Sequence, residues 1–575
     1  MAVKKYQLVL TLVFLGMTLV GAIGLNTYPG DVVRSTRVAT TSDGVQISFN
    51  TYHKSTIPAN RPVIVMGHGV IVNKEMMTNF AIELAARDFV VASIDWRGHG
   101  HSGGTLENNK HILDLEAVIG TIPAIVPTAN MSAIGLIGYS MGGGPTFQYA
   151  VNHSAVKAWV GVGTAPRGNV ANTTNPRNVL VIRGEFDEAF SLKGLVQQMV
   201  NLTGVSSPAD VQLDHLYGSI ASGNARKLDT VPLADHLTVP WDAAFISSAT
   251  DWMVQTFDAI VPDLSVMVYH ARAFMLFAGL IGLVGLVYGI ALMLARALGF
   301  KDKEPGQEIV GSVATAGTSE SSKANRTRND AGLSSPRFLL LYYAWTFLLI
   351  PTAIIPAMSF FLPLFLTSFL VTLVGCYAIN VAIFSWRYFK RSMQGTMPFT
   401  SIFWSGARDR RTWLIGTVVT LVIVLGFWLV VGLNYLGSMP ALDRTGYVLI
   451  YGAIMFLCYM AISTFSEKVV VQFIDRKVRF SSEKVRYVVH SFVAFMLVYS
   501  WFFAIIMLIC AAMGSMFIAM IAWLMIPIYL FGSFAGVYLQ RLTGSSIPNA
   551  LLQATLLTLL IVTLSPLGSL LRMFM

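Results

Sequence analysis

The run Gly138-Tyr139-Ser140-Met141-Gly142 decides how this chain folds. It matches the pattern G-x-S-x-G, and it lies between an apolar run typical of a buried strand and a stretch with helical periodicity. Glycine on both sides suits a turn in which flanking side chains would collide with the neighbouring strand and helix. Such a turn pushes the Ser140 hydroxyl out of the sheet at a helix N-terminus, where backbone amides favour negative charge. A plain turn is the other interpretation of so short a motif, and its context favours Ser140 as a nucleophile.

Residues 32–257 around this motif alternate short β-rich apolar runs with helical stretches. This alternation is typical of an α/β fold, in which helices flank a mostly parallel sheet. The sequence predicts strands at 45–50, 62–67, 89–95, 133–138, 158–163, 179–183 and 227–231. It predicts helices at 79–87, 112–125, 142–152, 192–202 and 243–256.

A second loop, Gly67-His68-Gly69-Val70, follows one of the predicted buried strands. The oxyanion that develops in acyl transfer needs two hydrogen-bond donors aimed at it. The backbone N–H of Met141, together with that of Gly69 or Val70, would supply them. His68 is predicted to organise this loop rather than to act as a base.

The run DWRGHGHSGG at 95–104 resembles a segment found in the α/β-hydrolase superfamily. Together with the two motifs above, it gives the chain a resemblance to this superfamily over about residues 32–257. The similar proteins are esterases, monoglyceride lipases and related serine peptidases. In that family the D-x-R-G-x-G-x-S-x-G segment is structural and supports the oxyanion loop. His99 and His101 lie close together in it, but no cysteine or clustered carboxylate accompanies them, so no metal site is predicted.

The resemblance places the acidic member of a catalytic triad on the loop after the penultimate strand. There Gly184-Glu185-Phe186-Asp187 has the family's G-x-x-D ending, and Asp187 is the predicted orienting carboxylate. Glu185 and Glu188 are near enough to be rivals. The hydrogen bond to the imidazole depends on direction, and the family's position favours Asp187.

The base is expected after the last strand and before the final helix, where His236 lies. His215 is closer in sequence to Asp187, but it precedes the run that we interpret as the last strand. The order Ser, Asp, His is the one expected for this fold. In the predicted reaction, His236 takes the proton of Ser140, Ser140 attacks a carbonyl carbon, and water then hydrolyses the acyl-enzyme. This chemistry requires no cofactor and no metal.

Only about a dozen residues, 165–177, separate two of the predicted strands. They are too few for the helical cap that many α/β-hydrolases insert there. The pocket is therefore expected to be open, or covered by the membrane or by another part of the chain, which favours a bulky or membrane-borne substrate.

The whole chain is too apolar for a soluble protein of 575 residues, since 54% of it is hydrophobic and 12% is charged. Two lysines precede the apolar run 6–25, so this segment is predicted to cross the membrane with its N-terminus inside. A cleaved signal peptide is the other interpretation. Basic residues follow the run 274–294, which returns the chain to the cytoplasm and leaves the intervening domain outside. Further spans are predicted at 338–360, 362–384, 413–433, 448–465, 488–510, 516–537 and 550–570, about nine in all, with the C-terminus outside.

The predicted organisation therefore has five parts. They are an N-terminal membrane helix at 1–27, an extracytoplasmic α/β-hydrolase domain without a large cap at 28–263, a second membrane helix at 264–300, a disordered cytoplasmic linker at 301–337, and a bundle of about seven spans at 338–575. The net charge of +10 resides largely in short loops between spans, so the lipid bilayer and not nucleic acid is the predicted partner. The sequence does not determine the oligomeric state.

The role of the bundle is predicted from what its spans contain. A transporter or proton relay would need ionisable residues at mid-membrane, where such groups are costly. The predicted spans contain almost none, so an anchor or scaffold is expected. The bundle resembles no family that we recognise.

Taken together, these features predict a membrane-anchored serine hydrolase that cleaves a carboxylic ester, with a lipid or another acylated compound as substrate. A serine peptidase of the prolyl-oligopeptidase or aminopeptidase type shares the same motifs and stays an alternative. A third alternative is a ligand-binding or transport component that uses a hydrolase fold without catalysis. Intact candidates for every triad role weigh against it.

Overall fold

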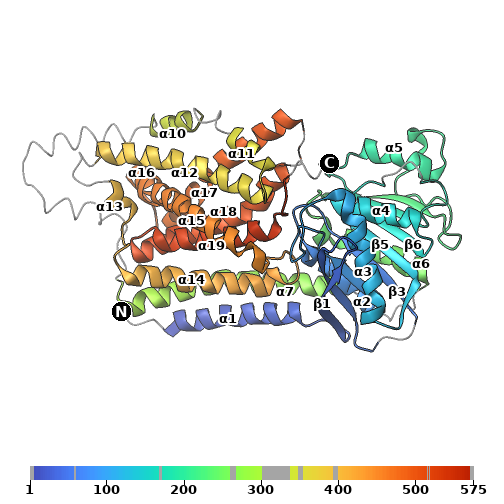
Figure 1. Ribbon diagram of the computed structural model, residues 1–575. Coiled ribbons are helices and arrows are strands. Elements are labelled where there is room, and N and C mark those ends of the chain that lie inside the picture. Colours follow the sequence, from blue (N-terminus) through green and yellow to red (C-terminus); the bar gives the residue numbers. More distant parts are fainter. Residues whose placement is uncertain are drawn as a thin grey trace, which may run out of the picture.

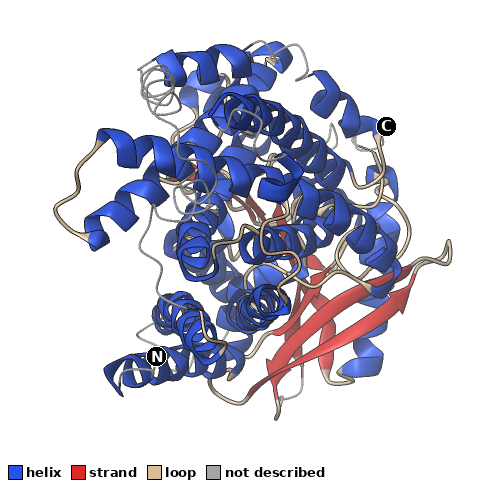
Figure 2. Ribbon diagram, turned by 90° about the vertical axis from the view of Figure 1, so that its left-hand side faces the viewer, coloured by secondary structure: helices blue, strands red, loops and turns tan. Residues whose placement is uncertain are grey.

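The computed structural model describes residues 5–56, 60–166, 171–258, 267–300, 337–347, 354–392, 399–514, 516 and 518–569. These residues form a sheet domain and a helical bundle that lie end to end (Figure 1). The N-terminus lies at the end of the bundle that is far from the sheet. Figure 2, turned by 90°, shows many of the bundle helices end-on, with strands of the sheet domain beside and behind them.

An eight-stranded sheet forms the centre of the first part, in the order β1-β2-β4-β3-β5-β6-β7-β8. Its strands are β1 (Val32–Thr40), β2 (Gln46–Lys54), β3 (Arg61–Gly67), β4 (Val90–Ile94), β5 (Ala129–Tyr139), β6 (Val156–Val162), β7 (Val179–Gly184) and β8 (Arg226–Val231). β2 pairs antiparallel with β1 and β4, and all other neighbours are parallel. The predicted mostly parallel sheet is confirmed.

The sequence missed one strand, β1, and the reason is its place in the sheet. This strand lies at an edge, and most of its side chains are exposed or half-buried. A strand without a buried face has no apolar alternation for the sequence to reveal.

Helices cover both faces of the sheet. They are α2 (Thr78–Ala86), α3 (His111–Ile125), α4 (Gly143–Asn152), α5 (Leu192–Thr203) and α6 (Ala243–Phe257). Consecutive residues of β5 point to opposite faces, so Leu136 packs in one apolar cluster with Phe147 of α4, and Ile137 packs in another with Phe80 of α2. Short helical turns complete the domain: η1 (Lys74–Met77), η2 (Asn108–Lys110), η3 (Ser140–Gly142), η4 (Pro208–Asp210) and η5 (Val239–Trp241). Between β6 and β7, the described residues 163–166 and 171–178 contain no helix.

The second part is built from long apolar helices. They are α1 (Lys5–Asn26), α7 (Val268–Ala297), α10 (Arg337–Phe347), α11 (Ile354–Met358), α12 (Phe365–Ser392), α13 (Phe399–Phe403), α14 (Arg410–Phe427), α15 (Thr445–Phe465), α16 (Val471–Lys477), α17 (Glu483–Met513), α18 (Ala519–Thr543) and α19 (Ile547–Leu564). The turns η7 (Ser359–Phe361) and η9 (Leu442–Arg444) are 3-10 helices, and η8 (Trp428–Gly432) and η10 (Ser466–Val470) are π-helices. The largest apolar cluster of this part, which includes Phe369, Met455 and Phe502, is called the bundle core below.

Eight helical segments among the described residues are long and apolar enough to cross a membrane. The sequence predicted about nine. The difference concerns the predicted span 338–360, because residues 348–353 lie outside the described part, and α10 and α11 on either side are each shorter than a span. The predicted linker 301–337 also lies outside the described part, except for Arg337, which begins α10.

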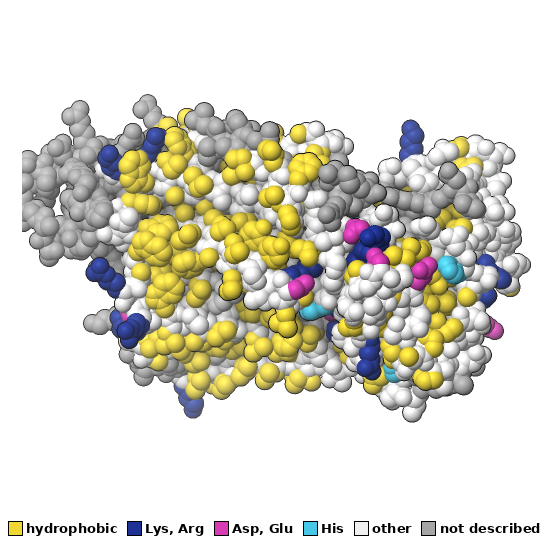
Figure 3. Space-filling view, in the orientation of Figure 1, with side chains coloured by type: hydrophobic (Ala, Val, Ile, Leu, Met, Phe, Trp, Pro, Cys, Tyr) yellow, Lys and Arg dark blue, Asp and Glu magenta, His cyan; other side chains and the backbone are white. Residues whose placement is uncertain are grey.

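Charge and apolar side chains are separated on the surface of the bundle (Figure 3). Apolar side chains cover its length, and Lys and Arg side chains gather at the end far from the sheet. Exposed basic residues of this end are Lys5, Arg410, Arg479 and Lys484. The distribution is the one that the positive-inside rule associates with a cytoplasmic face.

The fourth predicted span of the bundle region needs a correction. The sequence predicted a span at 448–465, followed by a basic cytoplasmic loop from Lys468. In the structure the helical path continues from α15 through η10 and α16 to Lys477. Glu467 and Lys468 are therefore inside the bundle, 5% and 7% exposed. The prediction ended the span at the first charged pair, whereas polar groups of neighbouring helices accommodate both side chains.

The carboxyl edge of the sheet faces the bundle. Val70 and Ile71 after β3, and Leu106 after β4, belong to the bundle core. Met141 after β5 and Trp241 after β8 pack against it. Ligands of open α/β sheets bind at this edge, so any site there lies between the two parts of the molecule.

A buried arginine joins the sheet domain to the bundle. Arg444 donates from Nη2 to the Gly98 carbonyl oxygen at 2.7 Å and from Nη1 to the carbonyl oxygens of Val562 at 3.0 Å and Ser565 at 2.8 Å. The Leu567 N–H also donates to the Gly98 oxygen, at 2.7 Å. Gly98 has φ +75°, and a Cβ there would lie 2.9 Å from the Leu567 oxygen. A glycine is required at this contact for both reasons.

Helices α1 and α7 pack closely because small residues face each other. A Cβ added to Gly21 would lie 2.4 Å from the Gly279 Cα, and one added to Gly282 would lie 2.5 Å from the Thr18 nitrogen. Small residues that let backbones approach are typical of membrane helix pairs. The close contacts between these glycines join α1 to α7 within the bundle.

We expect Gly21→Leu to destabilise the protein by about 1–3 kcal/mol, because the added side chain cannot fit without separating the two helices. Gly16→Leu is the matched control, since Gly16 lies on the same helix with nothing within 4 Å of its Cβ position. Thermal unfolding of the purified protein in detergent measures both. Equal shifts for the two variants would contradict the packing.

Candidate active site

A strained turn presents Ser140 at the end of β5. Ser140 has φ +50°, a value that non-glycine residues rarely adopt. Any side chain at the flanking glycines would collide with neighbouring backbone, as the sequence predicts. A Cβ on Gly138 would lie 2.5 Å from the Gly143 Cα, and one on Gly142 would lie 2.4 Å from the Gly67 oxygen. The tight approach of β3, β5 and α4 therefore requires both glycines and directs the serine side chain out of the sheet.

Three side chains that are far apart in the sequence meet at this turn. Ser140 Oγ lies 2.9 Å from His236 Nε2, and His236 Nδ1 lies 3.1 Å from Asp187 Oδ2. The Asp187 side chain is fully buried, and its second oxygen accepts hydrogen bonds from the N–H groups of Ala189 at 2.9 Å and Phe190 at 2.8 Å. These amides hold the carboxylate in the orientation that leaves Oδ2 for the imidazole.

The imidazole of His236 is held on several sides. Its ring lies 5.5 Å from the Tyr139 ring and 5.6 Å from the Phe190 ring, centroid to centroid. The Tyr139 hydroxyl donates to the His236 carbonyl oxygen at 2.9 Å. Gly163, with φ +52°, brings backbone close behind the ring, since a Cβ there would lie 3.2 Å from His236 Nδ1.

The rival residues lie elsewhere. Glu185 Oε2 accepts from the Leu233 N–H at 3.0 Å, and Glu188 Oε2 accepts from the backbone N–H of His236 at 3.2 Å, so neither carboxylate bonds the imidazole. Burial raises the pKa of Glu188. His215 is exposed and packs against the Tyr217 ring at 4.7 Å.

The loop with the predicted oxyanion donors lies against the serine. A Cβ on Gly69 would be 3.2 Å from the Ser140 Cβ. His68 Nε2 accepts from the Trp96 N–H at 3.3 Å, so Nδ1 carries the proton and donates to the Gly69 carbonyl oxygen at 2.6 Å. Burial lowers the pKa of His68 and keeps the ring neutral. The Gly69 carbonyl and the Val70 N–H share one planar peptide group, so this bond also fixes the direction of the Val70 N–H.

A second imidazole holds the next peptide group. His99 Nε2 donates to the Val70 carbonyl oxygen at 2.5 Å, and burial lowers the pKa of His99 to about 3. His99 directly follows Gly98, the residue that Arg444 of the bundle contacts. The bundle thus holds the segment that positions this loop. Whether the N–H groups of Met141, Gly69 and Val70 stabilise an oxyanion stays a prediction.

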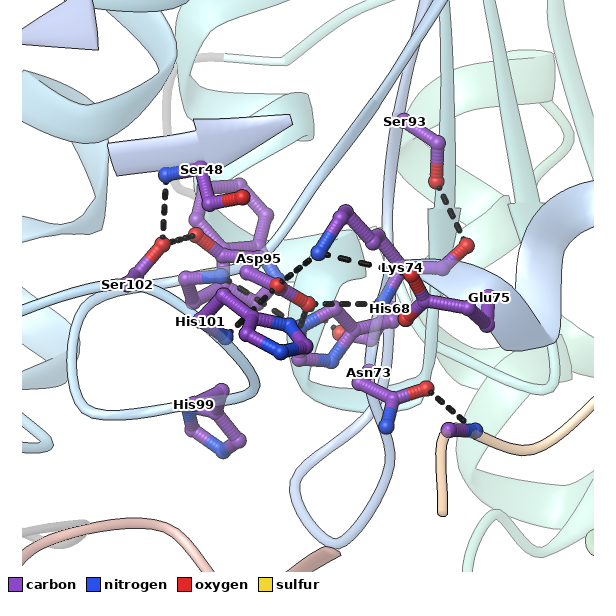
Figure 4. A network of polar contacts seen from close by, with 12 residues as sticks. Ser48, His68, Asn73, Lys74, Glu75, Ser93, Asp95, His99, His101 and Ser102 are labelled. Carbon is purple, nitrogen blue, oxygen red and sulfur yellow. Dashed lines mark hydrogen bonds and ion pairs between the residues drawn. The ribbon is translucent and has the colours of Figure 1, made fainter. Parts of the chain in front are cut away.

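A buried ion pair lies behind the loop (Figure 4). Lys74 donates from Nζ to Asp95 Oδ2 at 2.5 Å and from its backbone N–H to Oδ1 at 2.8 Å. Burial acts against the charge on Lys74, but the Asp95 carboxylate raises its pKa above the ordinary value. Burial acts against the Asp95 charge too, yet Lys74 lowers the pKa of Asp95 to about 2. The neighbouring Asn73 Oδ1 accepts from the N–H of Gly437 in the bundle at 3.1 Å.

Sequence reasoning missed Lys74 and Asn73. A lysine or an asparagine in a loop predicts a solvated surface, and only the fold shows that Lys74 is 1% exposed. Asp95 was part of the recognised D-x-R-G-x-G-x-S-x-G run, which was the one available signal. For metals, the described residues contain no group of three or more His, Cys, Asp or Glu side chains that could hold an ion.

Comparisons with known proteins agree with this architecture. Residues 58–211 match the family model Hydrolase_4, described as serine aminopeptidase, S33. A monoacylglycerol lipase of Mycolicibacterium smegmatis is 31% identical over 114 residues, which are 19% of this chain and 39% of that protein. The match thus spans about two fifths of the relative's length.

Two solved structures each match about 40% of this chain. The Pyrococcus furiosus esterase Pf2001 is 18% identical, with a TM-score of 0.31, over 40% of this chain and 96% of that one. A putative dienelactone hydrolase from Klebsiella pneumoniae is 14% identical, with a TM-score of 0.30, over 40% and 98% of the two chains.

The family match falls on the residues that form β3 to β7 and the turn around Ser140. The sheet order and the strand-turn-helix motif extend the same architecture to both sides of that match. Residues 32–257 therefore have the α/β-hydrolase fold, and residues 58–211 within them match a hydrolase family.

Proposed function

We propose that this chain is a serine hydrolase that cleaves carboxylic esters of membrane-borne lipids. The observation that carries the proposal is the hydrogen-bonded series Ser140 Oγ, His236 Nε2 and Asp187 Oδ2, with 2.9 Å and 3.1 Å between the successive pairs. A nucleophile, a base and an orienting acid in this order can activate an alcohol without a cofactor.

In the proposed mechanism His236 Nε2 takes the proton from Ser140 as the serine oxygen attacks the ester carbonyl carbon. Asp187 keeps the imidazole in the tautomer with the proton on Nδ1 and stabilises its positive form. The N–H of Met141 and that of Gly69 or Val70 stabilise the oxyanion. His236 then protonates the departing alkoxide, and the alcohol leaves. Water, deprotonated by His236, hydrolyses the acyl-enzyme and restores Ser140.

The surroundings of Ser140 support a membrane-borne substrate. An apolar wall at the carboxyl edge of the sheet includes Met141, next to the serine, and Val70, Ile71 and Trp241 from neighbouring loops, which belong to the bundle core or pack against it. An acyl chain needs an apolar wall of this kind. A chain anchored by α1 and α7, with its basic end in the cytoplasm, would hold this wall at the outer membrane surface. The printed name of the relative, monoacylglycerol lipase, agrees with a lipid ester as substrate.

A serine peptidase is the second candidate, and the description of the matching family model supports it. An aminopeptidase would need an anionic group for the substrate's free amine. Glu188, a carboxyl group close to His236, instead accepts a hydrogen bond from the His236 backbone, and burial raises its pKa, which disfavours the charged form. The ester hydrolase is therefore the stronger proposal.

Purified full-length protein is expected to react with a fluorophosphonate probe, and Ser140→Ala is expected to abolish the labelling. We expect His236→Ala to lower kcat/KM for a soluble ester by about 10⁴-fold or more, because the serine loses its base. His215→Ala is the matched control and should retain activity, since its side chain is exposed and packs against the Tyr217 ring. Labelling that survives Ser140→Ala, or equal losses in both histidine variants, would contradict the proposed triad.

Substrate preference separates the two enzyme classes. We expect p-nitrophenyl esters to be hydrolysed, with kcat/KM rising with acyl length because of the apolar wall, and aminoacyl p-nitroanilides to be hydrolysed slowly or not at all. The assay uses one enzyme preparation in detergent, with Ser140→Ala subtracted as background. Faster cleavage of the aminoacyl amides would favour the peptidase.

The bundle is expected to affect the reaction through Arg444. We expect Arg444→Gln to lower kcat for a soluble ester by roughly 10- to 100-fold with little change in KM, because the contact with Gly98 supports the His99–Val70 bond in the oxyanion loop. Arg411→Gln, a bundle arginine whose side chain is 49% exposed, is the control. Thermal unfolding separates a general loss of stability from an effect on the reaction. Unchanged kcat in Arg444→Gln would show that the bundle does not position the loop.

A further inference from the structure

A small polar cavity lies inside the bundle, among residues that take no part in the candidate active site. It is bounded by η10 and helices α15, α17, α18 and α19, and its polar lining includes Ser463, Ser466, Glu467, Asn549 and Gln553. The room inside is about 10 Å³, which corresponds to one water-sized sphere.

Glu467 is the one carboxylate in this lining. It is 5% exposed, and its Oε1 atom accepts from Asn549 Nδ2 at 3.1 Å. Its Oε2 atom has no hydrogen-bond partner of good geometry among the described residues. Lys468 follows it in the chain, but the Lys468 ammonium donates to the Ile402 carbonyl oxygen at 2.9 Å and forms no ion pair with Glu467. A carboxylate in such surroundings is costly without a positive charge beside it.

The hydrogen bonds of the cavity leave acceptors for an occupant. Asn549 Nδ2 donates to Glu467 Oε1 and to Ser463 Oγ, the latter at 2.8 Å. Gln553 Nε2 donates to Asn549 Oδ1 at 2.8 Å and to the Gly532 carbonyl oxygen at 3.3 Å. Both hydrogens of each amide are therefore used within the protein. The polar atoms that still face the cavity are therefore oxygen atoms of the carboxylate, hydroxyl and amide carbonyl groups.

The backbone is also unusual here, because Glu467 lies in the π-helical turn Ser466–Val470. A π-turn widens the helix and changes its carbonyl bonding, and such turns recur at functional sites. In membrane proteins, interrupted helices whose carbonyls and side-chain oxygens surround a small cavity coordinate ions. Glu467, within this π-turn, lines the cavity.

We propose that this cavity binds one sodium ion. A single carboxylate matches a single positive charge, and a lining of oxygen atoms suits a hard cation. The volume admits one ion without its water shell. Within the described part of the chain there is no His or Cys cluster to select a transition metal. This site is independent of the proposed hydrolase reaction.

The first test is binding of radioactive sodium to the full-length protein in detergent, with sodium-free choline chloride as the background salt. We expect saturable binding of one ion per chain, and a higher unfolding temperature in sodium chloride than in choline chloride at equal ionic strength. This measurement needs no variant. Absence of bound sodium together with equal unfolding temperatures would overturn the proposal and leave water or a proton as the occupant.

Variants then locate the ion. Glu467→Gln is expected to abolish sodium binding and the sodium-dependent shift in unfolding temperature, because the neutral amide has the same shape without the charge. Glu467→Asp keeps the charge and is expected to weaken binding at least tenfold. Glu483→Gln is the control, since its side chain is 65% exposed at the end of α17. Sodium binding that persists unchanged in Glu467→Gln, or that is lost equally in Glu483→Gln, would overturn the site.

Discussion

The approach of Gly142 to the Gly67 carbonyl is the constraint on which the geometry around Ser140 depends. A Cβ at Gly142 would lie 2.4 Å from that oxygen, so no larger residue allows the turn after β5 to pack against the end of β3. The same packing brings Gly69 beside Ser140 and holds the serine at φ +50°. Such strain persists only where the surrounding structure enforces it. Asp187 and His236 can then reach the turn, because β7 and β8 end at the same sheet edge.

The bundle is more than a tether, because buried arginines bind it to the sheet domain. Arg444 and Arg272 are 2% and 3% exposed, and neither has a carboxylate within ion-pair distance among the described residues. Arg272 of α7 donates from Nε to Asn79 Oδ1 of the sheet domain at 3.5 Å, and within the bundle it donates to the Leu25 carbonyl oxygen at 2.9 Å and to Asn434 Oδ1 at 3.1 Å. A buried cation that relies on neutral oxygens tolerates little displacement, since every lost bond leaves a charge unsatisfied. These contacts therefore fix how the sheet edge faces the bundle.

Sequence reasoning succeeded where a pattern reflects burial. Seven strands with buried faces, and the helices between them, were predicted within a few residues, and the three side chains predicted as a triad lie within hydrogen-bond distance of one another, while their catalytic role stays a prediction. It failed where partners distant in the chain decide the outcome. The sequence of β1 does not alternate between apolar and polar residues, because the strand lies at an edge of the sheet. Lys74 is buried only because Asp95 receives it, and Glu467 belongs to the bundle only because Asn549 lies opposite. The sequence pattern around a residue does not reveal a partner that is far away in the chain.

The position of Ser140 also bears on how a lipid substrate could reach it. Each methylene moved from an apolar environment into water costs about 0.8 kcal/mol, so a chain of about 16 carbons costs on the order of 12 kcal/mol. An enzyme that drew lipids through water would lose most of its binding energy to that transfer. In this chain Met141, next to the serine, packs against the bundle core. If the basic end of the bundle is cytoplasmic, the serine faces the outer membrane surface, and an acyl chain can approach along apolar surface while the ester bond alone enters the polar site.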